Sequence, residues 1–187
     1  MRKRNENSRS LLSAHKIPLE VRIVCYNNFN IIWNSKRGLV TMNKVDTYWQ
    51  AFCEQEGLKD TQYKEAFQFG VMADWLADLV VEGKKTATCS SFPIYEIEGE
   101  PLPKVGEYSI VLNGNDDPVA IIQETAVDIM PFNEIPEAFA LAEGEGDYED
   151  WYLGHVEFFT NYLAKFNMEF DVTMLTVCER FKKVYPK

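Results

Sequence analysis

The chain has 187 residues, and its 46% hydrophobic and 13% aromatic content excludes a disordered protein and suits one domain with a modest extension. Its formal net charge of -10 disfavours duplex DNA as a partner, because nucleic-acid affinity rests largely on neutralising phosphates with Lys and Arg. No apolar run approaches the roughly 20 residues that span a bilayer, so we expect no membrane partner.

The first 41 residues differ from the rest of the chain in composition and charge. They carry eight Lys or Arg residues against Glu6 and Glu20, whereas the remainder carries 11 basic and 27 acidic residues. The run Lys36-Arg37-Gly38 back-translates to a purine-rich tract like a bacterial ribosome-binding site, which would make Met42 the natural start. The alternatives are a basic arm that contacts nucleic acid and a folded N-terminal strand. We therefore divide the chain into a basic extension at 1–41, foreign or native, and a domain at 42–187.

The four cysteines give no sign of a disulfide framework or a metal site. Cys25, Cys53, Cys89 and Cys178 are scattered, with no CxxC and no Cys/His pair at metal-ligand spacing. We expect reduced thiols in a cytoplasmic protein, with no metal and no cofactor.

Apolar residues recur at helical spacing in several segments after Met42. The first of these helices has Asp46 or Thr47 as its expected N-cap, and Asp147 is a candidate cap for the last. Glycines at 57 and 83 are plausible stops for the first two helices. The predicted helices span 45–58, 72–82, 136–142 and 148–166.

The remaining periodic segments predict strands. Residues 107–112 and 119–124 flank a turn rich in Asn, Asp and Gly and are expected to form a hairpin. The second strand should continue over 125–132 with a bend near Ala126, and further strands are expected at 84–90 and 174–184. Short strands interleaved with helices, without βαβ regularity, predict an α+β fold with a small barrel.

The strongest chemical signal is the segment GKKTAT at 83–88. Lys84 and Lys85 lie between a helix end and a strand, on which Thr86 and Thr88 should share one face. A desolvated Lys can have a lowered pKa and activate a hydroxyl nucleophile, or it can donate to a phosphate or an oxyanion. The alternative is two solvated lysines that favour the C-terminus of the helix.

An acidic loop provides a second candidate. Glu143, Glu145 and Asp147 could divide general acid and base roles near a lysine, or they could form a solvated loop in which Asp147 caps the next helix. His155 is the only histidine after Met42, and a lone helical His is either packed or functional. This count excludes a multi-histidine metal site in the acidic domain.

Three aromatic residues lie close to the Lys-Thr segment in the sequence. Phe92, Tyr95 and Tyr108 could stack on a nucleobase, as single-stranded binders require, or could belong to the core.

Several segments together resemble the ASCH-domain family. They are GKKTAT at 83–88, EPLPKVGEY at 100–108, FALAEGEGD at 139–147, Trp151 with His155, and VCERF at 177–181. They occur in family order, over roughly residues 49–185. The resemblance implies a PUA-like β-barrel with flanking helices and a cleft beside the Lys-Thr segment.

The resemblance also implies a role in RNA chemistry. One branch of the family consists of small amidohydrolases that deacetylate N(4)-acetylcytidine through a Lys, a Thr nucleophile and a Glu, and ribonuclease activity is also known in the family. By this likeness Lys85, Thr88 and Glu143 are the catalytic candidates, with Glu145 as the alternative to Glu143. The candidate substrate-binding residues are Lys84, Thr86, Tyr95, Glu145 and His155.

Three functions remain open from the sequence. An amidohydrolase acting on a modified nucleoside suits the acidic surface, whereas a ribonuclease must bind a polyanion and is disfavoured by the charge. A non-catalytic RNA- or nucleotide-binding module would need the cleft but no nucleophile. The expected partner is a nucleoside or a short single-stranded RNA, and the sequence does not fix the oligomeric state.

Overall fold

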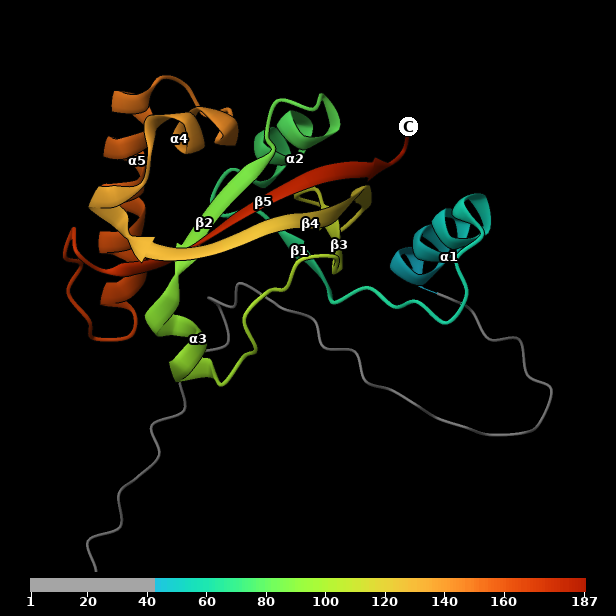
Figure 1. The fold of residues 1–187 in the computed structure, drawn as a ribbon, viewed down its shortest axis with the longest axis horizontal. Helices are drawn as coiled ribbons and strands as arrows, with labels where there is room; N and C mark the ends of the chain where they lie inside the picture. The colour runs from blue at the N-terminus through green and yellow to red at the C-terminus, as the bar shows by residue number, and fades with distance from the viewer. Residues whose placement is uncertain (1–42) are drawn as a thin grey trace, which may run out of the picture.

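The computed structural model describes residues 43–187, so the predicted extension at 1–41 lies outside the described residues (Figure 1). Five strands form one curled sheet, a half-barrel, in the order β1-β3-β4-β5-β2. Only the β1–β3 pair is parallel. The predicted α+β fold is confirmed. The strands are β1 (Glu65–Gln68), β2 (Ala87–Ser91), β3 (Tyr108–Leu112), β4 (Pro118–Pro131) and β5 (Leu175–Tyr185).

The helices follow the predicted order. They are α1 (Lys44–Glu56), α2 (Ala73–Val81), α3 (Phe92–Glu98), α4 (Glu137–Glu143) and α5 (Tyr148–Ala164), with a 3-10 turn at Phe132–Glu134. The sequence did not predict α3 or β1. None of the helices in residues 43–187 has the length and apolar character needed to cross a membrane.

One predicted helix cap is wrong and one is confirmed. Asn43, not Asp46 or Thr47, caps α1, because its side-chain oxygen accepts a 2.8 Å hydrogen bond from the backbone N–H of Asp46. Asp147 caps α5 as expected and accepts a 3.0 Å bond from the backbone N–H of Asp150.

The predicted hairpin is the β3–β4 pair, and β4 continues without a break to Pro131. Its pairing with β5 shifts register between Glu124 and Ala126, which is the bend expected near Ala126. The hydroxyl of Thr125, the residue passed over by the register, donates to the carbonyl of Arg180 at 2.8 Å. Such a bulge bends a strand and increases its twist, which helps this sheet to curl.

The central strands bury both of their faces. Ile110 packs with the Trp49 and Phe52 side chains of α1, whereas the next residue, Val111, packs with the apolar face of α2. This alternation is the two-residue period of a strand. Helices α1 and α2 therefore cover opposite faces of the sheet.

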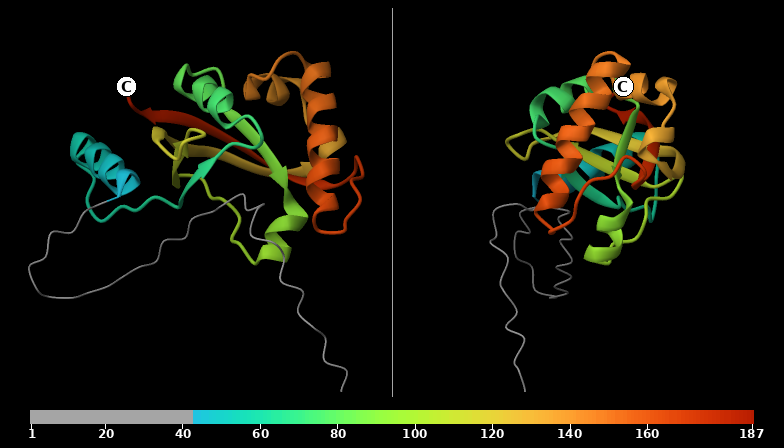
Figure 2. Two further views of the ribbon diagram at one scale, coloured as in Figure 1. Left: turned by 180° about the vertical axis from the view of Figure 1, so that it is seen from behind. Right: turned by 90° about the vertical axis from the view of Figure 1, so that its left-hand side faces the viewer.

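A third apolar cluster forms where β2 meets α4 and α5. These two helices lie together at one end of the sheet (Figure 2). Ala87 and Cys89 of β2 pack there with Trp151 and Phe159 of α5, all of them buried. This packing places the strand that follows the Lys-Thr segment beside the helix that ends at Glu143 and the helix that carries His155.

Candidate functional site

The adjacent side chains of Lys84 and Lys85 differ in exposure to solvent. Gly83 ends α2 with a φ of 74°, and the backbone N–H groups of Lys84 and Lys85 both donate to the carbonyl of Leu79. The Lys84 side chain is exposed and pairs with Glu82 at 2.7 Å, as the solvated alternative predicted for both lysines. Lys85 is only 2% exposed. Strand β2 begins at Ala87, so strand alternation does not govern where Lys85 points.

Both candidate glutamates bind Lys85. The Nζ atom of Lys85 lies 2.8 Å from Oε2 of Glu143 and 2.6 Å from Oε1 of Glu145. Gly144 separates the two carboxylates and has a φ of 76°, and a Cβ there would lie 3.1 Å from the carbonyl oxygen of Lys84. Glycine is required at this position because the backbone is left-handed and the space is filled. Glu143 is 1% exposed, so this ion pair is buried.

The lysine is held in its charged form. Burial opposes the charge on Lys85, but the carboxylates of Glu143 and Glu145 outweigh it and raise the pKa of Lys85. The lowered pKa considered from the sequence is therefore not found. An ammonium group suits the second of the two roles considered, donation to a developing oxyanion or another anionic group.

A cavity of about 630 Å³ opens above this ion pair. Its lining includes six of the eight candidate site residues: Lys85, Thr88, Tyr95, Glu143, Glu145 and His155. The other two, Lys84 and Thr86, are not part of the lining, and the Thr86 hydroxyl donates to the carbonyl of Ala142 at 3.3 Å. The expected cleft beside the Lys-Thr segment is therefore present.

Thr88 lies in β2, one residue beyond Ala87, and lines the cavity with a partly buried side chain. Among the described residues its hydroxyl has no hydrogen-bond partner. A hydroxyl in this position can donate to, or attack, a molecule bound in the cavity.

The aromatic residues of the cavity are mostly not those selected from the sequence. Tyr95 lines it, with its hydroxyl 3.2 Å from that of Ser90, but Tyr108 packs in the core with its ring 5.6 Å from that of Trp49. Phe92 is not part of the lining. Trp75 of α2 is 41% exposed and lines the cavity. Phe158 and Tyr162 of α5 also line it.

Two glutamates on the strands form an acidic wall that the sequence did not reveal. Glu124 is 5% exposed, its Oε2 atom has no hydrogen-bond partner among the described residues, and burial raises its pKa to about 7. Burial and then the charge of Glu124 raise the pKa of Glu179 to about 8. The sequence signal for this wall was a glutamate within each of two apolar segments, Val119–Glu124 and Val177–Phe181. The same pattern is typical of a strand with one solvent-exposed face.

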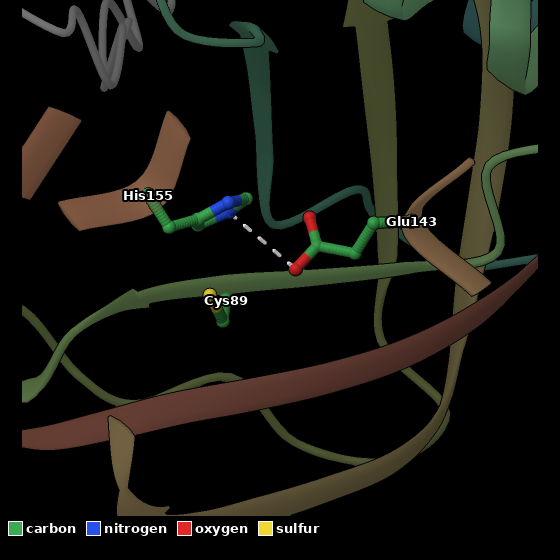
Figure 3. Close-up of side chains that lie close together, drawn as sticks. All are labelled: Cys89, Glu143 and His155. Atoms are coloured by element: carbon green, nitrogen blue, oxygen red, sulfur yellow. Dashed lines mark ion pairs between the residues drawn. The ribbon is translucent and has the colours of Figure 1, made fainter. Parts of the chain in front are cut away.

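Cys89 and His155 lie beside Glu143, and these three side chains could hold a metal ion (Figure 3). A ligand atom from each of Cys89, Glu143 and His155 lies within 4.8 Å of the others. The Nε2 atom of His155 is 3.7 Å from Oε1 of Glu143. Burial, and then the Glu143 carboxylate, raise the pKa of the Cys89 thiol well above its ordinary value. Sequence spacing could not find this set, because its members come from β2, α4 and α5.

Comparison with known proteins agrees with this architecture. A family model described as the ASCH domain matches residues 64–185. The crystal structure of protein EF3133 from Enterococcus faecalis V583 is similar at 43% identity, covering 75% of this chain and 88% of that one, with a TM-score of 0.71. An ASCH domain structure from Lactobacillus crispatus JV V101 matches at 30% identity, covering 79% of this chain and 99% of that one, with a TM-score of 0.73. No curated protein matches. The chain belongs to the ASCH domain family.

Proposed function

We propose that the cavity binds a nucleoside, or a nucleotide of a short single-stranded RNA, and that the protein removes the acetyl group of N(4)-acetylcytidine. One observation carries this proposal: Lys85, the two glutamates that bind its ammonium group, and Thr88 all line one cavity. A cation, carboxylates and a hydroxyl are the groups needed to cleave an amide through an acyl-enzyme.

The reaction divides into two balanced steps. In the first, the Thr88 hydroxyl oxygen attacks the acetyl carbonyl carbon and gives its proton to the Glu143 carboxylate. The Lys85 ammonium stabilises the negative oxygen of the tetrahedral intermediate. The C–N bond then breaks, and Glu143 returns the proton to the N4 atom of cytidine, which leaves as the amine. In the second step, water attacks the carbonyl carbon of the Thr88 ester and gives a proton to Glu143. The C–O bond to Thr88 then breaks, Glu143 returns this proton to the Thr88 oxygen, and acetic acid leaves and ionises to acetate, so that the net reaction consumes one water molecule.

The walls of the cavity favour an uncharged nucleoside over a polyanion. Trp75 offers a half-exposed indole and Tyr95 a phenol ring on which a base can stack. Glu124 and Glu179 can accept hydrogen bonds from N–H groups of a ligand, or donate them when protonated. The lining also contains other carboxylates that repel phosphates: Glu65, Glu98, Glu100 and Glu157.

A substrate panel tests this assignment. The full chain would be incubated separately with N(4)-acetylcytidine, with single-stranded RNA that carries the same modification, and with unmodified single-stranded RNA. Release of acetate and cytidine by the wild type, absent in Thr88→Ala, supports the amidohydrolase. Cleavage of the unmodified RNA would replace it with a ribonuclease. Binding of cytidine without turnover by either protein would replace it with a binding module.

A further inference from the structure

The tautomer of His155 places a nitrogen lone pair opposite the Glu143 carboxylate. Its Nδ1 atom lies 2.9 Å from the carbonyl oxygen of Trp151, one turn earlier in α5. A carbonyl oxygen only accepts hydrogen bonds, so Nδ1 carries the proton and Nε2 of the neutral ring presents a lone pair. That lone pair faces Oε1 of Glu143 at 3.7 Å.

Among the described residues, no N–H or O–H group donates to the facing Glu143 oxygen. Lys85 binds the other oxygen of this carboxylate, Oε2, while Oε1 is buried with no hydrogen-bond partner among residues 43–187. Two acceptors thus face each other, and the Cys89 thiol, which lies within 4.8 Å of both, is the neighbouring group whose proton can serve them. Unpaired buried acceptors are unfavourable, and a divalent cation that displaces the thiol proton can bind all three groups at once.

We propose that Cys89, Glu143 and His155 bind one Zn²⁺ ion. The ligand set consists of sulfur, an imidazole nitrogen and one carboxylate oxygen. Such a set favours Zn²⁺ over Mg²⁺ or Ca²⁺. The groups that would orient two of these ligands are already in place, because the carbonyl of Trp151 accepts from the imidazole and Lys85 donates to the carboxylate. A thiolate and a carboxylate balance the charge of the ion, and Glu145 balances that of Lys85.

The ion can reach this site, because all three ligands line the cavity. Three protein ligands leave one of the four positions of a tetrahedral zinc site for water or a bound molecule. The zinc site goes beyond the proposed hydrolysis and competes with it. A bound ion would occupy the Oε1 atom of Glu143, and Oε2 is held by Lys85, so zinc should inhibit deacetylation.

The test is metal binding to the full chain after removal of metals with a chelator. Titration with Co²⁺, a spectroscopic substitute for Zn²⁺, should produce a thiolate-to-metal charge-transfer band at one equivalent, and Zn²⁺ should abolish it by displacement. Cys89→Ser should remove this band, and His155→Gln should weaken Zn²⁺ binding by about 100-fold or more. The absence of a charge-transfer band in the wild type would overturn the proposal and leave a proton shared by His155 and Glu143.

Two other cysteines provide matched controls. Cys178 is the cross-strand partner of Cys89 in the β2–β5 pair and is equally buried, but it is not part of the three-residue set. Cys178→Ser should keep the band, as should Cys25→Ser, whose thiol lies outside the described residues. Loss of the band in either control would assign the metal to another thiol and contradict the site. Because these readouts use no substrate, they remain informative if the deacetylation proposal fails.

Discussion

The Lys85 ammonium lies 2.8 Å from the Glu143 carboxylate, and both side chains are only 1% exposed. The fold holds this pair from two sides, since Lys85 follows the end of α2 and Glu143 ends α4. The backbone N–H of Thr86 donates to the carbonyl of Ala142 at 2.7 Å and fixes the two segments together. The geometry of the site is therefore set by the backbone as well as by the charges.

Removing the lysine should destabilise the fold. Lys85→Met leaves the buried Glu143 carboxylate uncompensated, and we expect it to lower the free energy of unfolding by about 3–5 kcal/mol. Adding Glu143→Gln should recover part of this loss, because it removes the unpaired charge. The adjacent Lys84→Met is the matched control, with an expected change below about 0.5 kcal/mol, since its ion pair is exposed. Equal effects of the two single variants in urea unfolding would contradict the buried ion pair.

The acidic wall should make stability fall as the pH rises. The carboxyl pKa values of Glu124 and Glu179 are raised from 4.5 to about 7 and about 8. Their contribution is complete below pH 4.5 and is lost as the pH rises through 7 to 8, because the unfolded chain releases these protons first. The charged groups facing Glu124 are Lys64, Glu65, Glu107 and Glu179.

Glu124→Gln should remove part of this pH dependence. We compare the free energy of unfolding of the variant with that of wild type at two pH values. The difference should favour the variant by about 2 kcal/mol more at pH 8.5 than at pH 5. The exposed Glu54→Gln in α1 serves as the control and should follow the wild type at both values. Parallel curves for Glu124→Gln and wild type would show that this carboxyl titrates normally.

Trp75 should contribute to binding rather than to folding. Stacking of a base on an aromatic ring is worth about 1–3 kcal/mol, so Trp75→Ala should raise the KM for the nucleoside by roughly 5- to 100-fold. Its kcat should change little, because the ring is not among the reacting groups. Leu141→Ala, which truncates another half-exposed apolar residue that does not line the cavity, should leave both constants unchanged. An unchanged KM in Trp75→Ala would place the base elsewhere.

The sequence predicted most of the fold because its long elements are strongly periodic. The hairpin at 107–124 and helix α5 satisfied the two-residue and 3.6-residue periods and were found within a few residues. β1 has only four residues, too short for a period to be distinguished. α3 follows β2 directly and has Pro93 in its first turn, a residue that suits a turn as well as a helix start. Asn43 was missed as a cap because Asp46 and Thr47 are equally suitable by residue type.

The site was only partly predictable for a different reason. Lys85, Thr88 and Glu143 could be named because the Lys-Thr segment and the acidic loop are contiguous motifs that resemble a family. The sequence could not distinguish Glu143 from Glu145, and the structure shows that both bind the same lysine. Cys89, Trp75 and Glu179 join the cavity only through tertiary packing, which no local spacing records.

The most direct test of the proposed chemistry compares two threonines that lie two residues apart. Thr88 lines the cavity, whereas Thr86 does not line it and donates its hydroxyl to the carbonyl of Ala142. We would measure kcat for hydrolysis of N(4)-acetylcytidine by wild type, Thr88→Ala, Thr88→Ser and Thr86→Ala. We expect a loss of roughly 1,000-fold or more in Thr88→Ala, substantial activity in Thr88→Ser and near wild-type activity in Thr86→Ala. Full activity in a folded Thr88→Ala would contradict the role of Thr88 as the nucleophile.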